Sequence, residues 1–132
     1  MKCLNAGTSL KWAFCGLCLL LFAGLNVANA QNLDSLRFNK SNLTSCDTTK
    51  AYVYGHLTYS NQTFDSVKQT NTNPPEVTAY TSSSGFGFGV HNTFSDTVNL
   101  GLLSASTDTI KLYLDDNGSL IDSIVKQVNV SA

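Results

Sequence analysis

Side-chain chemistry in residues 31–132 depends first on Cys46, His56 and His91, which are the only thiol and imidazole groups there. A Cys–His pair can perform thiol catalysis, but Ser45-Cys46-Asp47 matches no protease signature. Serine and aspartate are plentiful, yet the Gly-x-Ser-x-Gly turn of many serine hydrolases does not occur. Two histidines and one cysteine do not complete a closed zinc site unless a carboxylate joins them. We therefore predict no catalytic residue, no metal ion and no cofactor.

A second group of potential ligands consists of Asp115, Asn117 and Asp122 around a glycine. An EF-hand calcium loop with that glycine at its sixth position needs oxygen ligands at positions 1 and 12. Those positions hold Tyr113 and Ile124, so the EF-hand interpretation fails. A looser carboxylate site is one alternative. A solvated type I′ hairpin turn explains the same residues without a metal.

Tyr52, Tyr54 and His56 alternate along the sequence and therefore lie on one face of an expected strand. Tyrosine combines a broad ring with a polar tip, which suits a sugar ring or a protein partner. Strands also favour aromatic residues without any ligand. Carbohydrate-binding faces commonly use tryptophan, and residues 31–132 contain none. The stripe is a candidate partner-binding face, with a glycan as the weaker alternative.

Residues 85–90 read Gly-Phe-Gly-Phe-Gly-Val, which in a strand places Phe86 and Phe88 on one face and bare glycines on the other. Such a glycine face would let another backbone or a ligand approach closely. We favour a flexible strand that packs its Phe side into the core. Phe86 and Phe88 are also candidate partner contacts, because the segment is apolar, uncharged and free of proline.

The first 30 residues have the pattern of a secretory signal peptide. Lys2 and Lys11 supply the positive region, an apolar run follows over residues 12–27, and Ala-Asn-Ala stands at residues 28–30. The alternative is a transmembrane anchor, but glycine and asparagine interrupt the run before it reaches about 20 apolar residues. We expect cleavage after residue 30 and a secreted or periplasmic, extracytoplasmic product.

The expected mature chain is a single domain over residues 31–132, with no integral membrane segment. It carries six Lys or Arg against nine Asp or Glu, so its net charge is −3. This charge argues against nucleic acid as a partner, which favours a basic face. Cys46 is its only cysteine, a free thiol, so the fold must rely on its core rather than on disulfides. We expect Cys46 to be buried as a small apolar residue; an intermolecular link and a reactive thiol are the alternatives.

The fold class follows from apolar residues at every second position, separated by turn residues. The pattern predicts an all-β, small immunoglobulin-like β-sandwich of about seven strands. Gly55 is expected to mark a bulge, and a turn is expected near His91-Asn92. Asn117-Gly118 is the strongest hairpin signal, and a two-residue turn there would place Leu114 opposite Ile121. The expected strands are residues 35–38, 50–59, 63–68, 77–81, 85–90, 98–102, 110–114 and the segment after 118.

About 40 residues of the final third resemble bacterial immunoglobulin-like modules of the CARDB type. The matching features are Val90-His91-Asn92, the Ser/Thr-rich stretch after it, and Leu-Tyr-Leu-Asp-Asp at residues 112–116 before a second hairpin strand. The resemblance implies a β-sandwich in an extracytoplasmic setting.

These observations predict a non-enzymatic protein that acts through its surface, as an adhesion, matrix or appendage-associated component. Its partner would be another protein or a second copy of itself. The alternative is a small periplasmic binding or inhibitory module for a protein or a glycan. Five Asn-x-Ser/Thr sequences occur, at Asn39, Asn42, Asn61, Asn117 and Asn129; we interpret them as incidental, because Asn, Ser and Thr are abundant.

Overall fold

The computed structural model describes residues 31–132, which form strands and no helix. The expected signal peptide lies outside the described residues. The strands are β1 (Asn32–Phe38), β2 (Leu43–Thr44), β3 (Thr48–Tyr59), β4 (Gln62–Thr72), β5 (Pro75–Ser83), β6 (Gly89–Leu102), β7 (Thr109–Asp116), β8 (Ser119–Gln127) and β9 (Val130–Ser131).

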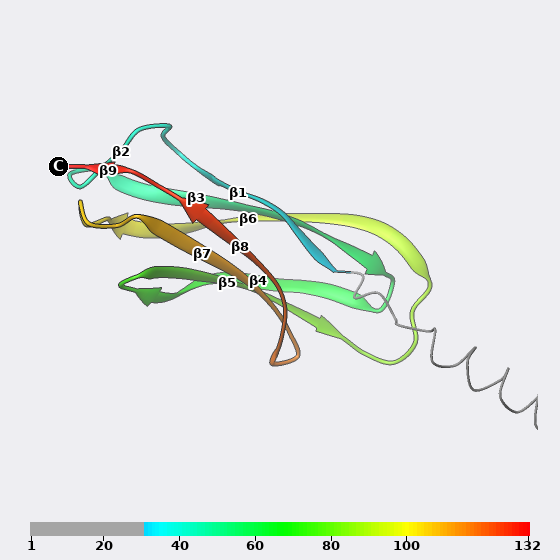
Figure 1. Ribbon diagram of the computed structural model, residues 1–132. Helices are drawn as coiled ribbons and strands as arrows, with labels where there is room; N and C mark the ends of the chain where they lie inside the picture. Colours follow the sequence, from blue (N-terminus) through cyan, green and yellow to red (C-terminus); the bar gives the residue numbers. More distant parts are fainter. Residues whose placement is uncertain (1–30) are drawn as a thin grey trace, which may run out of the picture.

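The strands form two main sheets that pack face to face (Figure 1). One sheet has the order β1-β3-β6 and the other β4-β5-β7-β8, while β2 and β9 form a short parallel pair. The all-β, sandwich-like architecture expected from the sequence is confirmed. Among the described residues, buried side chains from both main sheets form one hydrophobic core.

Alternation along β3 and β7 builds the core. Ala51 and Val53 of β3 are fully buried, whereas Tyr52 and Tyr54 between them are only partly covered. In β7, Ile110, Leu112 and Leu114 are fully buried, in register with the inner residues of β5. Each buried leucine or isoleucine side chain stabilises the fold by about 1.5–3 kcal/mol. The faces assigned to these strands from the sequence are therefore correct.

Gly55 of β3 is needed for close packing rather than for a bulge. It lies directly opposite Phe94 of β6, whose ring covers it. The ring of Phe94 stacks on that of Phe64 in β4, with centroids 4.6 Å apart and an interplanar angle of 9°, so it joins the two sheets. The bulge expected at Gly55 is instead in β1, where Asp34 is the extra residue.

The hairpin between β7 and β8 turns at Asn117-Gly118, as predicted. Both residues have positive φ angles, 52° and 85°, as a type I′ turn requires. The predicted pairing of Leu114 with Ile121 is wrong, because a bulge at this point places Leu114 opposite Asp122.

The predictions for residues 85–92 also need correction. Strand β6 begins at Gly89 and continues through His91 and Asn92, so no turn occurs there. Residues 84–88 form a connecting loop instead of a strand. The pairing of β3 with β6 is irregular between Leu57 and Tyr59, where the turn was expected, and resumes with Tyr59 opposite Gly89.

Candidate functional site

The largest exposed apolar side chains lie on the connection between β5 and β6. We call residues 84–88 the aromatic loop. Phe86 is 87% exposed and Phe88 is 74% exposed. Their rings meet edge to face with centroids 5.8 Å apart. The favoured prediction that these rings pack into the core is wrong, because the chain leaves the sandwich here. The two rings instead form an accessible aromatic surface.

The backbone of the aromatic loop is fixed by the turn between β3 and β4. Asn61 Nδ2 donates hydrogen bonds to the carbonyl oxygens of Ser84 (3.1 Å) and Gly85 (3.0 Å). The amide of Ser60 donates to the carbonyl of Phe88 at 2.9 Å, and the amide of Phe88 donates to Ser60 Oγ at 3.0 Å. The loop is therefore held in place before it meets any partner, which lowers the ordering cost of binding.

Two glycines make this arrangement possible. Gly85 has a φ of 63°, a left-handed conformation that other residues rarely adopt. A Cβ atom at Gly87 would collide with the side chain of Asn61. The glycines in the Gly-Phe repeat thus serve the loop conformation and its contact with Asn61, while the two phenylalanines face outward.

The tyrosine stripe occupies the outer face of the β1-β3-β6 sheet. Tyr54 is 38% exposed, and the guanidinium of Arg37 lies 5.6 Å from its ring centroid. Nδ1 of His56 donates a hydrogen bond to Asp34 Oδ1 at 2.8 Å. Together with Tyr52, these side chains form a polar, aromatic face whose members are held by neighbours on β1.

The three residues considered for chemistry are not brought together. The rings of His56 and His91 lie near each other, with centroids 5.2 Å apart. Cys46 is exposed in the turn between β2 and β3, so its predicted burial is wrong. The turn places it at the start of β3, whereas His56 is near the end of that strand. Within residues 31–132, no group of three or more His, Cys, Asp or Glu side chains could hold a metal ion.

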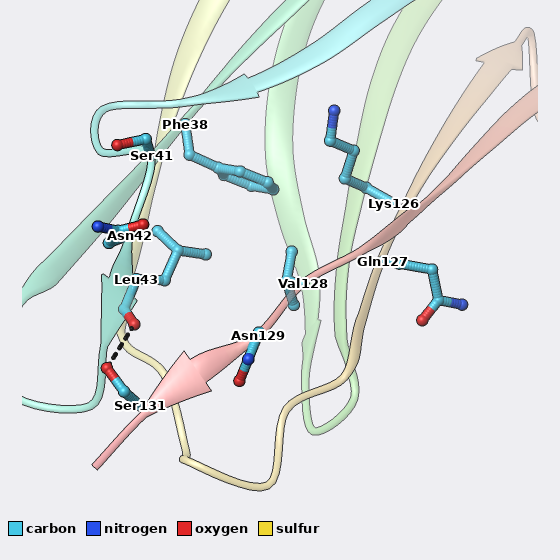
Figure 2. A pocket seen from close by; sticks show the side chains of 9 residues that line it. All are labelled: Phe38, Ser41, Asn42, Leu43, Lys126, Gln127, Val128, Asn129 and Ser131. Carbon is cyan, nitrogen blue, oxygen red and sulfur yellow. Dashed lines mark hydrogen bonds between the residues drawn. The ribbon is translucent and has the colours of Figure 1, made fainter.

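A pocket of about 310 Å³ lies at the end of the sandwich remote from the aromatic loop. Figure 2 shows Phe38, Leu43 and Val128 around the hollow, with Lys126 and Gln127 further out. The pocket is formed where the β1–β2 segment meets the end of β8, and polar side chains line the rest of it. No local sequence pattern indicates this pocket, because its two walls are about 85–90 residues apart in the chain.

The same end carries an ion pair that fixes the β2–β3 turn. Lys40 Nζ lies 2.8 Å from Asp47 Oδ2, and Thr44 Oγ1 donates to the same oxygen at 2.7 Å. The hydrogen bond from Lys40 is the main cause that lowers the pKa of the Asp47 carboxyl, and the hydrogen bond from Thr44 lowers it further. Because the pair is exposed, it orders the turn more than it stabilises the fold.

Two of the strand edges carry features that hinder pairing with another chain. On one side, the amide of Leu33 in β1 donates to Asp122 Oδ2 of β8 at 2.9 Å, which joins the edges of the two sheets. On the other side, β4 contains irregularities between Phe64 and Ser66 and between Gln69 and Asn71. Bulges of this kind are devices that hinder edge-to-edge association. Strand β6, with 14 residues, is the other edge of the β1-β3-β6 sheet, and its outer side pairs with no strand of the described residues.

Comparison with protein-family models, with curated proteins and with solved structures finds no match. The resemblance to CARDB-type modules stays a prediction. No helix among residues 31–132 is long and apolar enough to cross a bilayer.

Proposed function

We propose that residues 31–132 act outside the cytoplasm, after removal of residues 1–30 as a signal peptide, as a non-enzymatic component of an adhesive, matrix or appendage structure. The domain would be an immunoglobulin-like sandwich whose copies associate through the aromatic loop. Apart from the export pattern of residues 1–30, the support is an exposed aromatic pair on a loop whose backbone is fixed by hydrogen bonds.

The observation that carries this proposal is the exposure of Phe86 and Phe88 on an ordered backbone. Exposed aromatic side chains in a fixed position are typical anchors of protein interfaces. At the exposures found, the two residues present about 300 Å² of surface. Burying that surface contributes on the order of 7 kcal/mol, which is close to the lower estimates for the cost of association. Each contact is therefore weak, and association should depend strongly on concentration.

The test is the solution mass of residues 31–132 by light scattering, over a range of concentrations and with reductant to keep Cys46 reduced. The wild-type chain should form oligomers as its concentration rises. Phe88→Lys should reduce this association by at least tenfold, because a charged side chain resists burial.

The matched control is Val125→Lys, which adds the same charge at an apolar side chain that is 57% exposed on β8. It should associate as the wild type does. Circular dichroism must show that both variants are folded. An unchanged oligomer distribution in folded Phe88→Lys would remove the aromatic loop as the contact.

A second candidate function is a small binding or inhibitory module that uses the face of Tyr52, Tyr54 and His56. The contacts of Arg37 and Asp34 with this face favour it, because they hold its side chains in fixed positions. In this case Tyr52→Ala/Tyr54→Ala should abolish binding to an extracytoplasmic protein or glycan while Phe88→Lys leaves it intact. Equal binding by the tyrosine variant and the wild type would exclude the face.

A further inference from the structure

The aromatic loop and the pocket lie at opposite ends of the sandwich. Strand β6 starts at Gly89, directly after the loop, and ends at Leu102, opposite the first residue of β3. Strand β1 runs in the same direction, from Asn32 opposite His56 to Phe38, which lines the pocket. Figure 1 shows the β5–β6 connection at one end and the β2–β9 pair at the other.

The two ends differ in charge. The half of the sandwich that carries the aromatic loop holds five carboxylates and no Lys or Arg: Asp34, Asp65, Asp115, Asp116 and Asp122. The half that carries the pocket holds five basic residues and three carboxylates. The basic residues are Arg37, Lys40, Lys50, Lys111 and Lys126, and the carboxylates are Asp47, Glu76 and Asp108. Lys68 and Asp96 lie near the middle. An acidic end and a basic end attract each other, whereas two acidic ends repel.

The pocket also suits a phenylalanine ring. Its volume of about 310 Å³ exceeds the ~150 Å³ of an apolar cavity known to bind benzene. Phe38, Leu43 and Val128 offer apolar contacts, and an incoming ring could meet Phe38 edge to face. Lys126 at the rim can lie over an aromatic face.

A symmetric contact between two aromatic loops fits less well. It would bring together two halves that each hold five carboxylates, which repel. Insertion of the loop into the pocket instead brings the acidic half of one copy to the basic half of the next, and the walls of the hollow surround the ring.

We propose that the aromatic loop of one copy inserts into the Phe38–Leu43–Val128 pocket of a second copy, so that the chains assemble head to tail. This inference rests on the proposed self-association and specifies its partner surface. Because the two surfaces differ and lie at opposite ends, every pair of copies keeps one free loop and one free pocket. Repetition then produces an open chain of subunits, the form expected of a matrix or appendage component.

The test uses two variants of residues 31–132, each with one end disabled. Phe86→Ser/Phe88→Ser removes the aromatic rings. Lys126→Glu/Asn129→Trp makes the pocket rim acidic and places an indole beside the hollow; both positions are exposed, so the fold should persist. Lys68→Glu is the control, with the same charge change away from both ends.

In light scattering at low salt with reductant, the wild type and Lys68→Glu should form oligomers of increasing size. Each disabled variant alone should stay monomeric, with apparent affinity reduced at least tenfold. Mixed in equal amounts, the two variants should form pairs and nothing larger, since each supplies the end that the other lacks. Added salt should weaken the association, because attraction between the charged ends is screened.

The alternatives give different results. If the pocket variant assembles as the wild type does while the loop variant stays monomeric, the pocket is not the receptor, although the proposed function stands. Absence of pairs in the mixture also overturns the head-to-tail contact. If the loop variant assembles normally, or if the wild type is monomeric at all concentrations, the proposed function itself fails.

Discussion

Replacement of Gly55 by alanine tests the packing that joins the two sheets. A Cβ atom there would collide with Cζ of Phe94, and would lie 2.7 Å from Cε1 of the same ring and 2.8 Å from the carbonyl oxygen of Asn32. The ring of Phe94 cannot move away freely, because it stacks on Phe64. The carbonyl belongs to the first residue of β1. Both the stack and the edge strand must therefore shift.

The expected loss of stability follows from two opposing effects. Overpacking of a well-filled core costs about 1–3 kcal/mol, and a clash with backbone on one side places this site near the upper value. Alanine also restricts the unfolded chain, which returns about 0.4–1 kcal/mol. We expect a net decrease of about 2 kcal/mol in the free energy of unfolding. For a domain of this size, that corresponds to a decrease of about 10 °C in Tm.

Thermal and urea unfolding of residues 31–132, followed by circular dichroism, measure this change. Gly89→Ala is the matched control, because nothing lies within 4 Å of its added Cβ; it should be nearly neutral. Combining Gly55→Ala with Phe94→Leu should reduce the cost of the alanine, because the colliding ring is gone. If Gly55→Ala is as stable as the wild type, the close contact with Phe94 does not exist in solution.

Three further predictions concern the turns and the aromatic loop. In an NMR titration, Lys40→Ala should raise the lowered pKa of Asp47. The ion pair is present at neutral pH and is lost as the pH falls through that lowered pKa. An unchanged pKa in the variant would show that the pair does not form. Asn117→Ala should decrease the free energy of unfolding by about 1–2 kcal/mol, because φ is 52° there and the 2.7 Å hydrogen bond to the Ser83 carbonyl is lost. Asn117→Gly should decrease the free energy of unfolding by less, because glycine accepts a positive φ. Equal decreases for the two variants in urea unfolding would contradict this reasoning. Asn61→Ala should weaken self-association in light scattering, because the aromatic loop loses two hydrogen bonds, while its circular dichroism spectrum stays that of the wild type. Association equal to that of the wild type would mean that the order of the loop does not matter for the contact.

The sequence predicted the fold where local pattern decides the structure. Strict alternation in β3 and β7 identified the buried residues, because a strand exposes successive side chains on opposite faces. Asn117-Gly118 identified the hairpin, because only a few residues accept positive φ angles at both turn positions. Neither feature depends on contacts with distant parts of the chain.

The errors occurred where distant residues decide the structure. The bulge beyond Leu114 accompanies the hydrogen bond between Asp122 and the amide of Leu33, which is 89 residues away. Residues 85–90 have the alternation of a strand, but hydrogen bonds with Ser60 and Asn61 hold 84–88 in a loop. No local pattern reveals such partners.

The candidate surfaces were predicted in part. Phe86, Phe88 and the tyrosine stripe were identified by residue type, because aromatic side chains in a short, weakly charged domain are candidates for contact. The pocket was missed, since Phe38 and Leu43 meet Val128 only after β9 has paired with β2. The charge difference between the two ends was missed for the same reason: it exists only once the strands are in register.

The most direct test of the aromatic loop as the contact surface is a single tryptophan within the loop. Residues 31–132 contain no tryptophan, so Phe88→Trp gives an emission spectrum that reports on this position alone. We predict that the emission shifts to shorter wavelength as the protein is concentrated, with the same midpoint as the rise in mass measured by light scattering. A rise in mass while the indole keeps the spectrum of a solvent-exposed side chain would show that the copies associate elsewhere.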